Sequence, residues 1–353
     1  NDYPCRVQLA YDIAATYAEN FERGPQLDAV PAVPQTSPRP FLGRAINSPL
    51  GVAAGLLPNA KWIGAYAARG WDLLTYKTVR SVARECYPVP NWVFVDADAG
   101  EGPVVATETF PADPAAVSSA VCFGMPSREP AFWREDIARA KAALVPGQLL
   151  IVSVVASPEA GWSAAQVADD YAQCAAWAVE AGADVVEANY SCPNVCSAEG
   201  QVYTDVALSE TVTETIRSGM GDLPLLLKIG VFPDAPLQRD FLRTVSGSAN
   251  GITLVNGIAR EVRYPDGRPV FGEQYLRAGV LGRIIHEPCV KAVREARAVI
   301  DAEELPLALA AVGGVASVQD YEDFMAAGAD VVLCGSSPMY LPSLAVAIKA
   351  GLG

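Results

Sequence analysis

Short apolar runs recur along the chain, and segments of helical periodicity separate them. Each run is continuous rather than alternating, a pattern typical of strands that are buried on both faces of a parallel sheet. Several begin directly after or at a proline, glycine or aspartate, as strands often do. Eight such runs occur, at 49–55, 72–79, 148–156, 184–191, 224–230, 251–256, 307–314 and 330–336.

The segments between these runs place apolar residues three and four positions apart, as one face of a helix requires. The sequence AGAD occurs at 181–184 and again at 327–330, where a helix stop meets the next strand. The expected helices cover 60–70, 134–144, 163–183, 209–219, 237–248, 287–300 and 317–329.

Eight predicted strands with seven predicted helices between them predict the α/β class and, within it, a (β/α)8 TIM barrel. An open doubly wound sheet is the alternative. That fold would favour G-x-G-x-x-G after an early strand, and the chain has no such motif.

Two regions fall outside the alternation. Within residues 1–40, the sequence predicts an N-terminal helix over 7–24 that is followed by a proline-rich strap. The barrel is predicted to comprise residues 41–353. Residues 80–130 form an irregular insertion after the second strand that is too long for an ordinary connector, so we expect a lid or a pocket wall there. The N-terminal segment is expected to pack on the barrel or on a second subunit of a homodimer.

Composition restricts the partners. The chain has 353 residues, 51% hydrophobic and 19% charged, which is ordinary for a globular protein. A net charge of −14 repels nucleic acid and anionic lipid, so neither is an expected partner. No apolar run approaches the roughly 20 residues of a membrane helix, and no signal-peptide pattern occurs. We therefore expect a cytoplasmic protein that acts on a small molecule.

The eight cysteines are scattered without a CxxC pair, and His286 is the single histidine. This pattern argues against a zinc or iron–sulfur site, so no metal is expected. Catalytic triads built on histidine would all require His286, which leaves catalysis to other groups.

Glycines and hydroxyls follow the seventh and eighth strands. The sequences AVGGVAS (311–317) and CGSS (334–337) occupy the two loops where barrels of this kind commonly bind phosphate. Tight turns would explain either loop alone. Together they predict a phosphate site.

Polar residues end the other predicted strands and should meet at the same mouth of the barrel. A lysine within an apolar strand, as in LLLKIG, is costly to bury without a negative partner, so Lys228 should have one. Glu187 is the candidate partner if the lysine is purely structural; a cofactor site is the alternative. The residues at this rim are Lys77, Asn189, Ser191, Cys192, Asn194, Lys228 and Asn256.

In this order, NSPLGVAAG, LLTYKTV, VVEANYSCPNV, LLLKIG, ITLVNG, AVGGV and CGSS resemble the dihydroorotate dehydrogenase family of FMN-binding (β/α)8 barrels. The resemblance runs from about residue 40 to about residue 345, and N-x-S-C-P-N is its most distinctive element. It implies an oxidoreductase that acts on CH–CH bonds in pyrimidine-related metabolism.

The resemblance also implies residue roles. Lys228 would stabilise negative charge that develops on the reduced flavin. Lys77 would contact both flavin and substrate. The other residues implied to bind FMN are Ala54, Gly55, Thr78, Asn189, Asn256, Gly282, Gly313, Gly314, Gly335 and Ser336. Those implied to bind substrate are Lys77, Phe123, Gly124, Met125, Asn189, Asn194 and Asn256.

Cys192 matches the catalytic base of the family, with Lys77 beside it as the second catalytic residue. A thiol with a pKa near ~8.5 can serve as a base if its surroundings favour the thiolate. Cysteine here is typical of the soluble class, whereas quinone-using members carry serine. An inert strand-end cysteine is the alternative, and a redox role for Cys196 stays open.

The chain departs from the family at positions that are implied to contact the substrate. Family members have Asn-x-Met-Gly-Leu-Pro-Asn where this chain has VCFGMPS, so that Val121 and Ser127 replace two asparagines, and Gly257 stands where the family has serine or threonine. A site that loses such hydrogen-bond donors discriminates less well between one substrate and its analogues. We therefore expect a dihydroorotate-like cyclic amide or biosynthetic intermediate as substrate. A flavin-free lyase or isomerase that binds a phosphorylated substrate, and an inactive binding subunit, are the alternatives.

Overall fold

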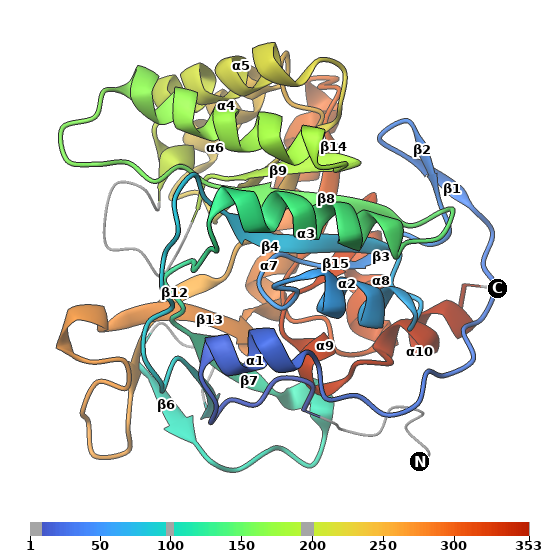
Figure 1. Ribbon diagram of the computed structural model, residues 1–353, viewed down its shortest axis with the longest axis vertical. Helices are drawn as coiled ribbons and strands as arrows, with labels where there is room; N and C mark the ends of the chain where they lie inside the picture. The colour runs from blue at the N-terminus through green and yellow to red at the C-terminus, as the bar shows by residue number, and fades with distance from the viewer. Residues whose placement is uncertain (1–8, 97–101, 192–200, 353) are drawn as a thin grey trace.

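Eight parallel strands close into a barrel in the order of the chain, which confirms the predicted TIM barrel (Figure 1). The computed structural model describes residues 9–96, 102–191 and 201–352. Every predicted apolar run forms one strand. The strands are β3 (Leu50–Val52), β4 (Leu73–Val79), β8 (Leu149–Val154), β9 (Val185–Asn189), β10 (Leu225–Ile229), β11 (Gly251–Leu254), β14 (Ala308–Val312) and β15 (Val331–Cys334).

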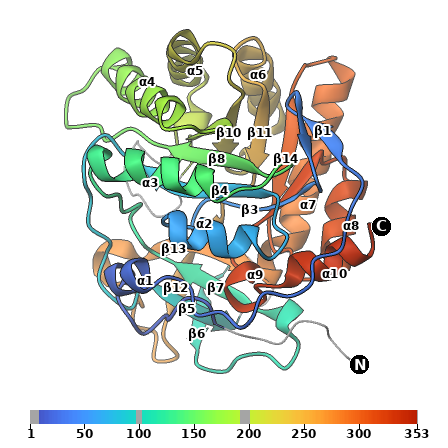
Figure 2. The ribbon, with the colours of Figure 1, turned by 45° about the vertical axis from the view of Figure 1, so that its right-hand side comes forward.

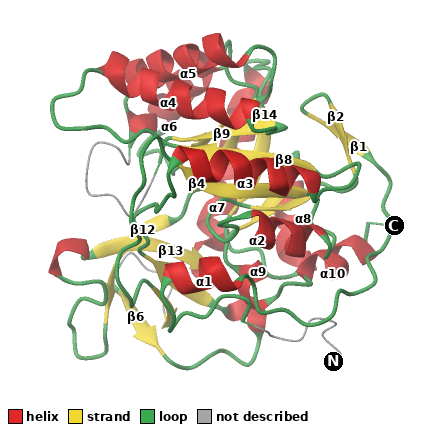
Figure 3. Cartoon of the chain, in the orientation of Figure 1, coloured by secondary structure: helices red, strands yellow, loops and turns green. Residues whose placement is uncertain are grey.

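Helices surround this barrel, and each predicted helix is present (Figure 3). Several begin at a side-chain cap, such as Ser163 and Ser317, whose hydroxyls accept from the backbone three residues later. The helices are α2 (Ala60–Ala67), α3 (Pro130–Ala142), α4 (Ala164–Glu180), α5 (Val206–Met220), α6 (Ala235–Val245), α7 (His286–Ala302), α8 (Val318–Ala326), α9 (Ser337–Tyr340) and α10 (Leu344–Ala350).

The interior of the barrel has an apolar floor and a polar upper layer. Side chains such as Leu73, Ile151 and Leu333 pack together in a buried cluster at the floor. The strand register then brings Lys228 beside Asn189 and Thr253, toward the carboxyl ends of their strands. Charged and amide groups are therefore concentrated at one end of the barrel, where active sites of this fold lie.

A second, smaller barrel lies beside this end (Figure 1). Residues 80–130, expected as an irregular lid or pocket wall, do line the cavities described below but contain regular strands. Three strands of this insertion and two strands that follow β11 close into the smaller barrel. The strands are β5 (Trp92–Asp96), β6 (Val104–Thr107), β7 (Ser118–Val121), β12 (Ile258–Arg263) and β13 (Arg277–Gly282).

Helix α1 (Tyr17–Arg23) is shorter than the helix expected over 7–24, at least over the described residues from 9 onward. Thr16 ends the irregular segment before it, because its hydroxyl and the Glu19 carboxylate form a capping box. α1 lies beside the smaller barrel and the start of α2 (Figure 2). Lys61 and Asn59 donate to the backbone carbonyls of Glu22 and Phe21, at 2.6 and 2.8 Å.

The remaining elements are short. The strap at 30–40 leads into a hairpin of β1 (Arg39–Phe41) and β2 (Arg44–Ile46). Single 3-10 turns occur at Pro114–Ala116, Val202–Thr204, Glu273–Tyr275 and Arg283–Ile285. Within the described ranges, no helix has both the length and the apolar character that crossing a bilayer requires.

Candidate active site

Two adjoining cavities occupy the mouth of the large barrel. The first, here called the inner cavity, has a volume of about 110 Å³ and is lined by the ends of several barrel strands and by the smaller barrel. The second, the glycine cavity, has about 20 Å³ and lies by the loops after β13, β14 and β15. The two share Val255, Gly257, Leu281, Val312 and Gly335, so they adjoin along a common wall and are together called the groove.

The inner cavity brings together many of the residues singled out from the sequence. Both lysines reach it, and Lys228 donates from Nζ to the carbonyl of Ala54 at 3.4 Å. Thr78 shares a 2.9 Å hydrogen bond with Ser153. Of the predicted site residues, Ala54, Gly55, Lys77, Thr78, Phe123, Met125, Asn189, Lys228, Asn256 and Gly335 line this cavity.

The structural alternative, in which Glu187 would be the partner of Lys228, is not what the structure shows. No ion pair joins these two described residues, and Glu187 instead accepts a 2.8 Å hydrogen bond from the Thr253 hydroxyl. Glu187 is fully buried in the barrel, whereas the Lys228 side chain points into the inner cavity. The lysine therefore directs its charge toward the groove, consistent with the cofactor interpretation.

Asn189 and Asn256 form a connected pair of amides at the edge of the inner cavity. Asn256 donates to the carbonyl of Ser191, and the backbone N–H of Ser191 donates to Asn189 Oδ1 at 3.2 Å. The Nδ2 group of Asn189 lies 3.5 Å from the Met125 sulfur, a weak acceptor. These contacts fix both amides before any ligand arrives.

The glycine cavity is lined by five residues predicted to hold a phosphate: Gly282, Gly313, Gly314, Gly335 and Ser336. Gly314 has a φ of +68°, and a Cβ there would lie 2.4 Å from the carbonyl oxygen of Gly282. The buried hydroxyls of Ser337 and Tyr340 also line this space, and neither has a hydrogen-bond partner within the described ranges. Two unsatisfied buried hydroxyls fit a phosphate, whose oxygens accept hydrogen bonds.

A cluster of potential metal ligands lies behind these loops, within the part of the chain that the structure describes. His286, Asp320 and Asp323 lie close together. Asp320 is held by Arg283 at 2.8 Å and by the backbone N–H of Ala316, and a His286 ring nitrogen lies 3.0 Å from the carbonyl of Gly313. The cluster thus braces the glycine loop.

The roof of the inner cavity is largely apolar. Val121, Phe123 and Met125 line it and supply no side-chain donor in place of the asparagines of the family pattern, whereas Trp92, which also lines it, has a buried indole N–H without a partner among the described residues. The Ser127 hydroxyl is bonded elsewhere, to the backbone of Arg80 and of Arg128. Gly124, predicted to touch substrate, does not line this cavity; it packs against Tyr87 with a φ of +71°.

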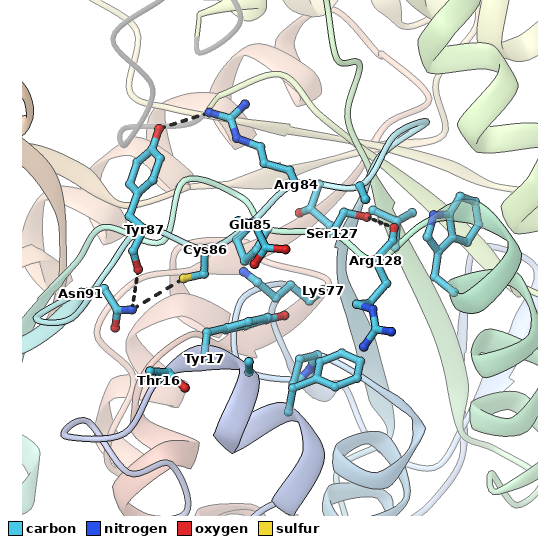
Figure 4. A pocket seen from close by; sticks show the side chains of 18 of the residues that line it. Thr16, Tyr17, Lys77, Arg84, Glu85, Cys86, Tyr87, Asn91, Ser127 and Arg128 are labelled. Carbon is cyan, nitrogen blue, oxygen red and sulfur yellow. Dashed lines mark hydrogen bonds between the residues drawn. The ribbon is translucent and has the colours of Figure 1, made fainter.

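A third cavity of about 570 Å³ lies beneath α1 and is here called the α1 cavity (Figure 4). The end of β4, the loop 83–91 and residues 126–129 complete its walls. Lys77 and Thr78 line both this cavity and the inner cavity. The Lys77 ammonium lies 5.8 Å from the centroid of the Tyr17 ring and 5.1 Å from that of Phe123, and these two rings contact each other with centroids 5.7 Å apart.

Cys86 lies in the α1 cavity next to Lys77 (Figure 4). Burial raises the pKa of its thiol to about 11, although the Lys77 charge and a hydrogen bond from Asn91 act in the opposite direction. The thiol is therefore protonated at neutral pH and is a poor nucleophile there.

Three residues named from the sequence lie outside the described residues: Cys192, Asn194 and Cys196. Sequence reasoning in turn missed the second barrel and the α1 cavity. The run WVFVD at 92–96, rich in β-branched and aromatic residues, is a strand signal that could have indicated β5. Nothing local indicates that Tyr17 and Arg128 would face the same cavity, because that depends on how α1 docks.

Comparison with known proteins gives one consistent result. A family model described as dihydroorotate dehydrogenase matches residues 135–353. The dihydroorotate dehydrogenase of Dictyostelium discoideum is 31% identical and the match covers 95% of both chains. The catalytic subunit of dihydroorotate dehydrogenase B (NAD(+)) from Desulforudis audaxviator is 30% identical over 72% of this chain and 75% of its own.

A solved structure shows the same fold. DHODH from Eimeria tenella, crystallised in complex with ferulenol, superimposes with a TM-score of 0.70. The match covers 89% of this chain and 83% of the other, at 16% sequence identity. At that identity the likeness supports the architecture alone.

Proposed function

The chain belongs to the dihydroorotate dehydrogenase family, and we propose that it uses FMN to oxidise or reduce the bond between two adjacent carbons of a cyclic amide. Members of this family are oxidoreductases that act on CH–CH bonds, and this chain is one of them. The cofactor, the individual residue roles and the substrate are the proposed parts.

The pair of adjoining cavities is the observation that carries the proposal. One end holds two buried lysines and two fixed amides, and the other holds glycines and two unsatisfied hydroxyls. Such a groove suits a ligand with a flat polar ring at one end and a phosphate at the other. The inner cavity would hold the ring of FMN, and Gly282, Gly313, Gly314, Gly335 and Ser336 would hold its phosphate.

When bound, FMN would supply a hydride acceptor, or a donor in the reverse direction. Lys228 would then contribute a fixed positive charge where negative charge develops. A buried ammonium is effective in this role because the low-dielectric surroundings screen it little. Trp92, Val121 and Phe123 would keep water out of the inner cavity, since their side chains form its apolar roof.

Cys192 would move the proton on the adjacent substrate carbon, acting as base in oxidation and as acid in reduction. This assignment comes from the sequence NYSCPN, because residue 192 lies outside the described residues. Lys77 would favour the thiolate through its positive charge. Asn189 and Asn256 would orient the amide groups of the substrate.

The substrate proposal follows from the roof. A cyclic amide related to dihydroorotate would still find Asn189 and Asn256, but the two asparagine positions of the family pattern are Val121 and Ser127 here. Sites that hydrogen-bond a substrate discriminate through such groups. We therefore propose a relative of dihydroorotate as the preferred substrate.

The test is to purify the protein, record its absorbance and mix it anaerobically with dihydroorotate and other dihydropyrimidines. We expect bound flavin that releases as FMN, and bleaching by a dihydropyrimidine faster than by dihydroorotate. A colourless protein that does not take up added FMN contradicts the cofactor proposal and favours the flavin-free lyase or isomerase. Bleaching at full speed by dihydroorotate contradicts the altered substrate alone.

A further inference from the structure

The α1 cavity has the size of a small-molecule pocket, and parts of its wall are held in place. Its volume of about 570 Å³ lies within the range of roughly 300–1,000 Å³ that is common for small-molecule pockets. Two of its aromatic walls are fixed by hydrogen bonds. Tyr76 donates to Asp136 at 2.8 Å, and the indole N–H of Trp133 donates to the carbonyl of Arg80 at 3.0 Å.

Its location ties it to the inner cavity. Lys77 and Thr78 belong to both walls, and the Lys77 ammonium lies against the contacting rings of Tyr17 and Phe123. The inner cavity, of about 110 Å³, is the proposed place of the flavin ring, so it leaves room for little of the substrate beyond its reacting bond. Space for a larger ligand lies on the other side of Lys77.

The charges around the α1 cavity favour an anion at its inner end. Lys77 is only 7% exposed, so its charge is screened little. The acidic residues Glu22, Glu85 and Glu129 also line the cavity but are exposed to solvent, which screens them. Two of them already lie beside Arg128, at 3.5 and 3.7 Å.

We propose that the α1 cavity receives a second portion of the substrate, a flat conjugated or aromatic group joined to an anionic group that pairs with Lys77. The substrate would thus be an organic acid larger than one six-membered ring, with its reacting bond in the inner cavity. The ring-bearing portion lies among Tyr17, Tyr76 and Trp133. This inference rests on the proposed function, since it names the substrate class of the same site.

Binding of trans-cinnamate to the purified protein tests it, measured by calorimetry with orotate as competitor. Cinnamate offers a carboxylate for Lys77 and a phenyl ring for the aromatic walls, and its neutral amide is the matched ligand. We expect cinnamate to bind at least ~10-fold more tightly than cinnamamide, as a charge-assisted hydrogen bond predicts. We also expect cinnamate and orotate to exclude each other, because both carboxylates need the same ammonium.

Two variants locate the site. Ala18 is exposed on α1 and lines the cavity, so Ala18→Trp fills it from the helix and should weaken cinnamate binding at least ~10-fold. Ala14→Trp adds the same ring to an exposed position just before α1 that does not line the cavity, and should leave binding unchanged.

The outcomes separate this inference from the proposed function. Equal binding of acid and amide, simultaneous binding of cinnamate and orotate, or equal affinity in the two tryptophan variants each overturns the inference. None of these results depends on bound flavin. A colourless protein that still binds cinnamate in competition with orotate keeps the α1 cavity as a ligand site and removes only the cofactor.

Discussion

Asn256 donates a 3.1 Å hydrogen bond from its Nδ2 group to the Oδ1 atom of Asn189, across the mouth of the barrel. The two side chains come from the ends of strands that are not adjacent, β9 and β11, with β10 between them. Each amide therefore holds the orientation of the other. This mutual restraint lets a substrate bind without first ordering either side chain.

Asn256→Ala should lower kcat/KM for the best dihydropyrimidine by roughly 10- to 100-fold, because it removes a direct contact and releases Asn189. Steady-state kinetics measures the effect. Asn47→Ala is the control: Asn47 precedes β3 at the other end of the barrel and donates to the carbonyl of Pro146. If both variants keep wild-type kcat/KM, the amide pair has no part in substrate recognition.

Gly314→Ala should abolish FMN binding and lower the melting temperature. A Cβ at Gly314 would meet the Gly282 carbonyl oxygen at 2.4 Å, and its φ of +68° disfavours alanine, which together cost about 1–3 kcal/mol or more. Gly219→Ala is the matched control within α5, where a Cβ meets nothing within 4 Å. It should raise stability by up to ~1 kcal/mol. Thermal melts and released-flavin absorbance check both, and unchanged FMN content in Gly314→Ala contradicts the phosphate assignment.

Asp72→Ala should destabilise the protein by about 3–5 kcal/mol, because it leaves the Lys349 ammonium buried without its carboxylate. The pair lies 2.7 Å apart, with 3% and 1% of the two side chains exposed. Urea unfolding measures the loss. Adding Lys349→Met should restore part of it, whereas Lys291→Met, which removes an exposed pair with Glu295, should cost at most ~1 kcal/mol. Equal effects of Asp72→Ala and Lys291→Met would show that burial does not strengthen the first pair.

Alkylation of Cys86 by iodoacetamide should be slow at pH 8 and should accelerate as the pH approaches 11, followed by mass spectrometry of its peptide. The reason is that burial raises the pKa of this thiol to about 11. Lys77→Met should slow the reaction further, since the lysine charge favours the thiolate. A fast reaction at pH 7 would contradict the buried position.

The same shift has a consequence for stability. The folded protein favours the neutral form of the Cys86 thiol. The thiol therefore contributes fully to the free energy of unfolding below a pH of about 9, and this contribution is lost as the pH rises through 11. Cys86→Ser should therefore flatten the dependence of unfolding free energy on pH over that interval. An unchanged slope would contradict the assignment.

The large barrel could be predicted from the sequence because its signals are local. Each strand is a short apolar run, each helix has its own periodicity, and caps such as Ser163 stand at the start. The convergence of Lys77, Asn189 and Lys228 on one cavity followed from the rule that parallel strands end at one edge.

The smaller barrel, the hydrogen bonding of Glu187 and the start of α1 could not be predicted, because they depend on contacts that the local sequence pattern does not show. β6 pairs with β12 through Val104 and Val262, which are far apart along the chain. Neither segment alone therefore indicates that the two strands belong to one sheet. Lys228 and Glu187 are both buried, but the carboxylate has a nearer donor in Thr253. The expected start of α1 was wrong because the capping box at Thr16 sets it, although the apolar pattern extends further back.

The smaller barrel also governs how this protein could be altered. Its β-strands are drawn from the connection after β4 and the connection after β11, and they close only when both are present. A loop graft that replaced one connection with that of another enzyme would leave open sheet edges over the catalytic mouth. Swapping specificity between relatives would therefore require transplanting the two connections as a single cassette.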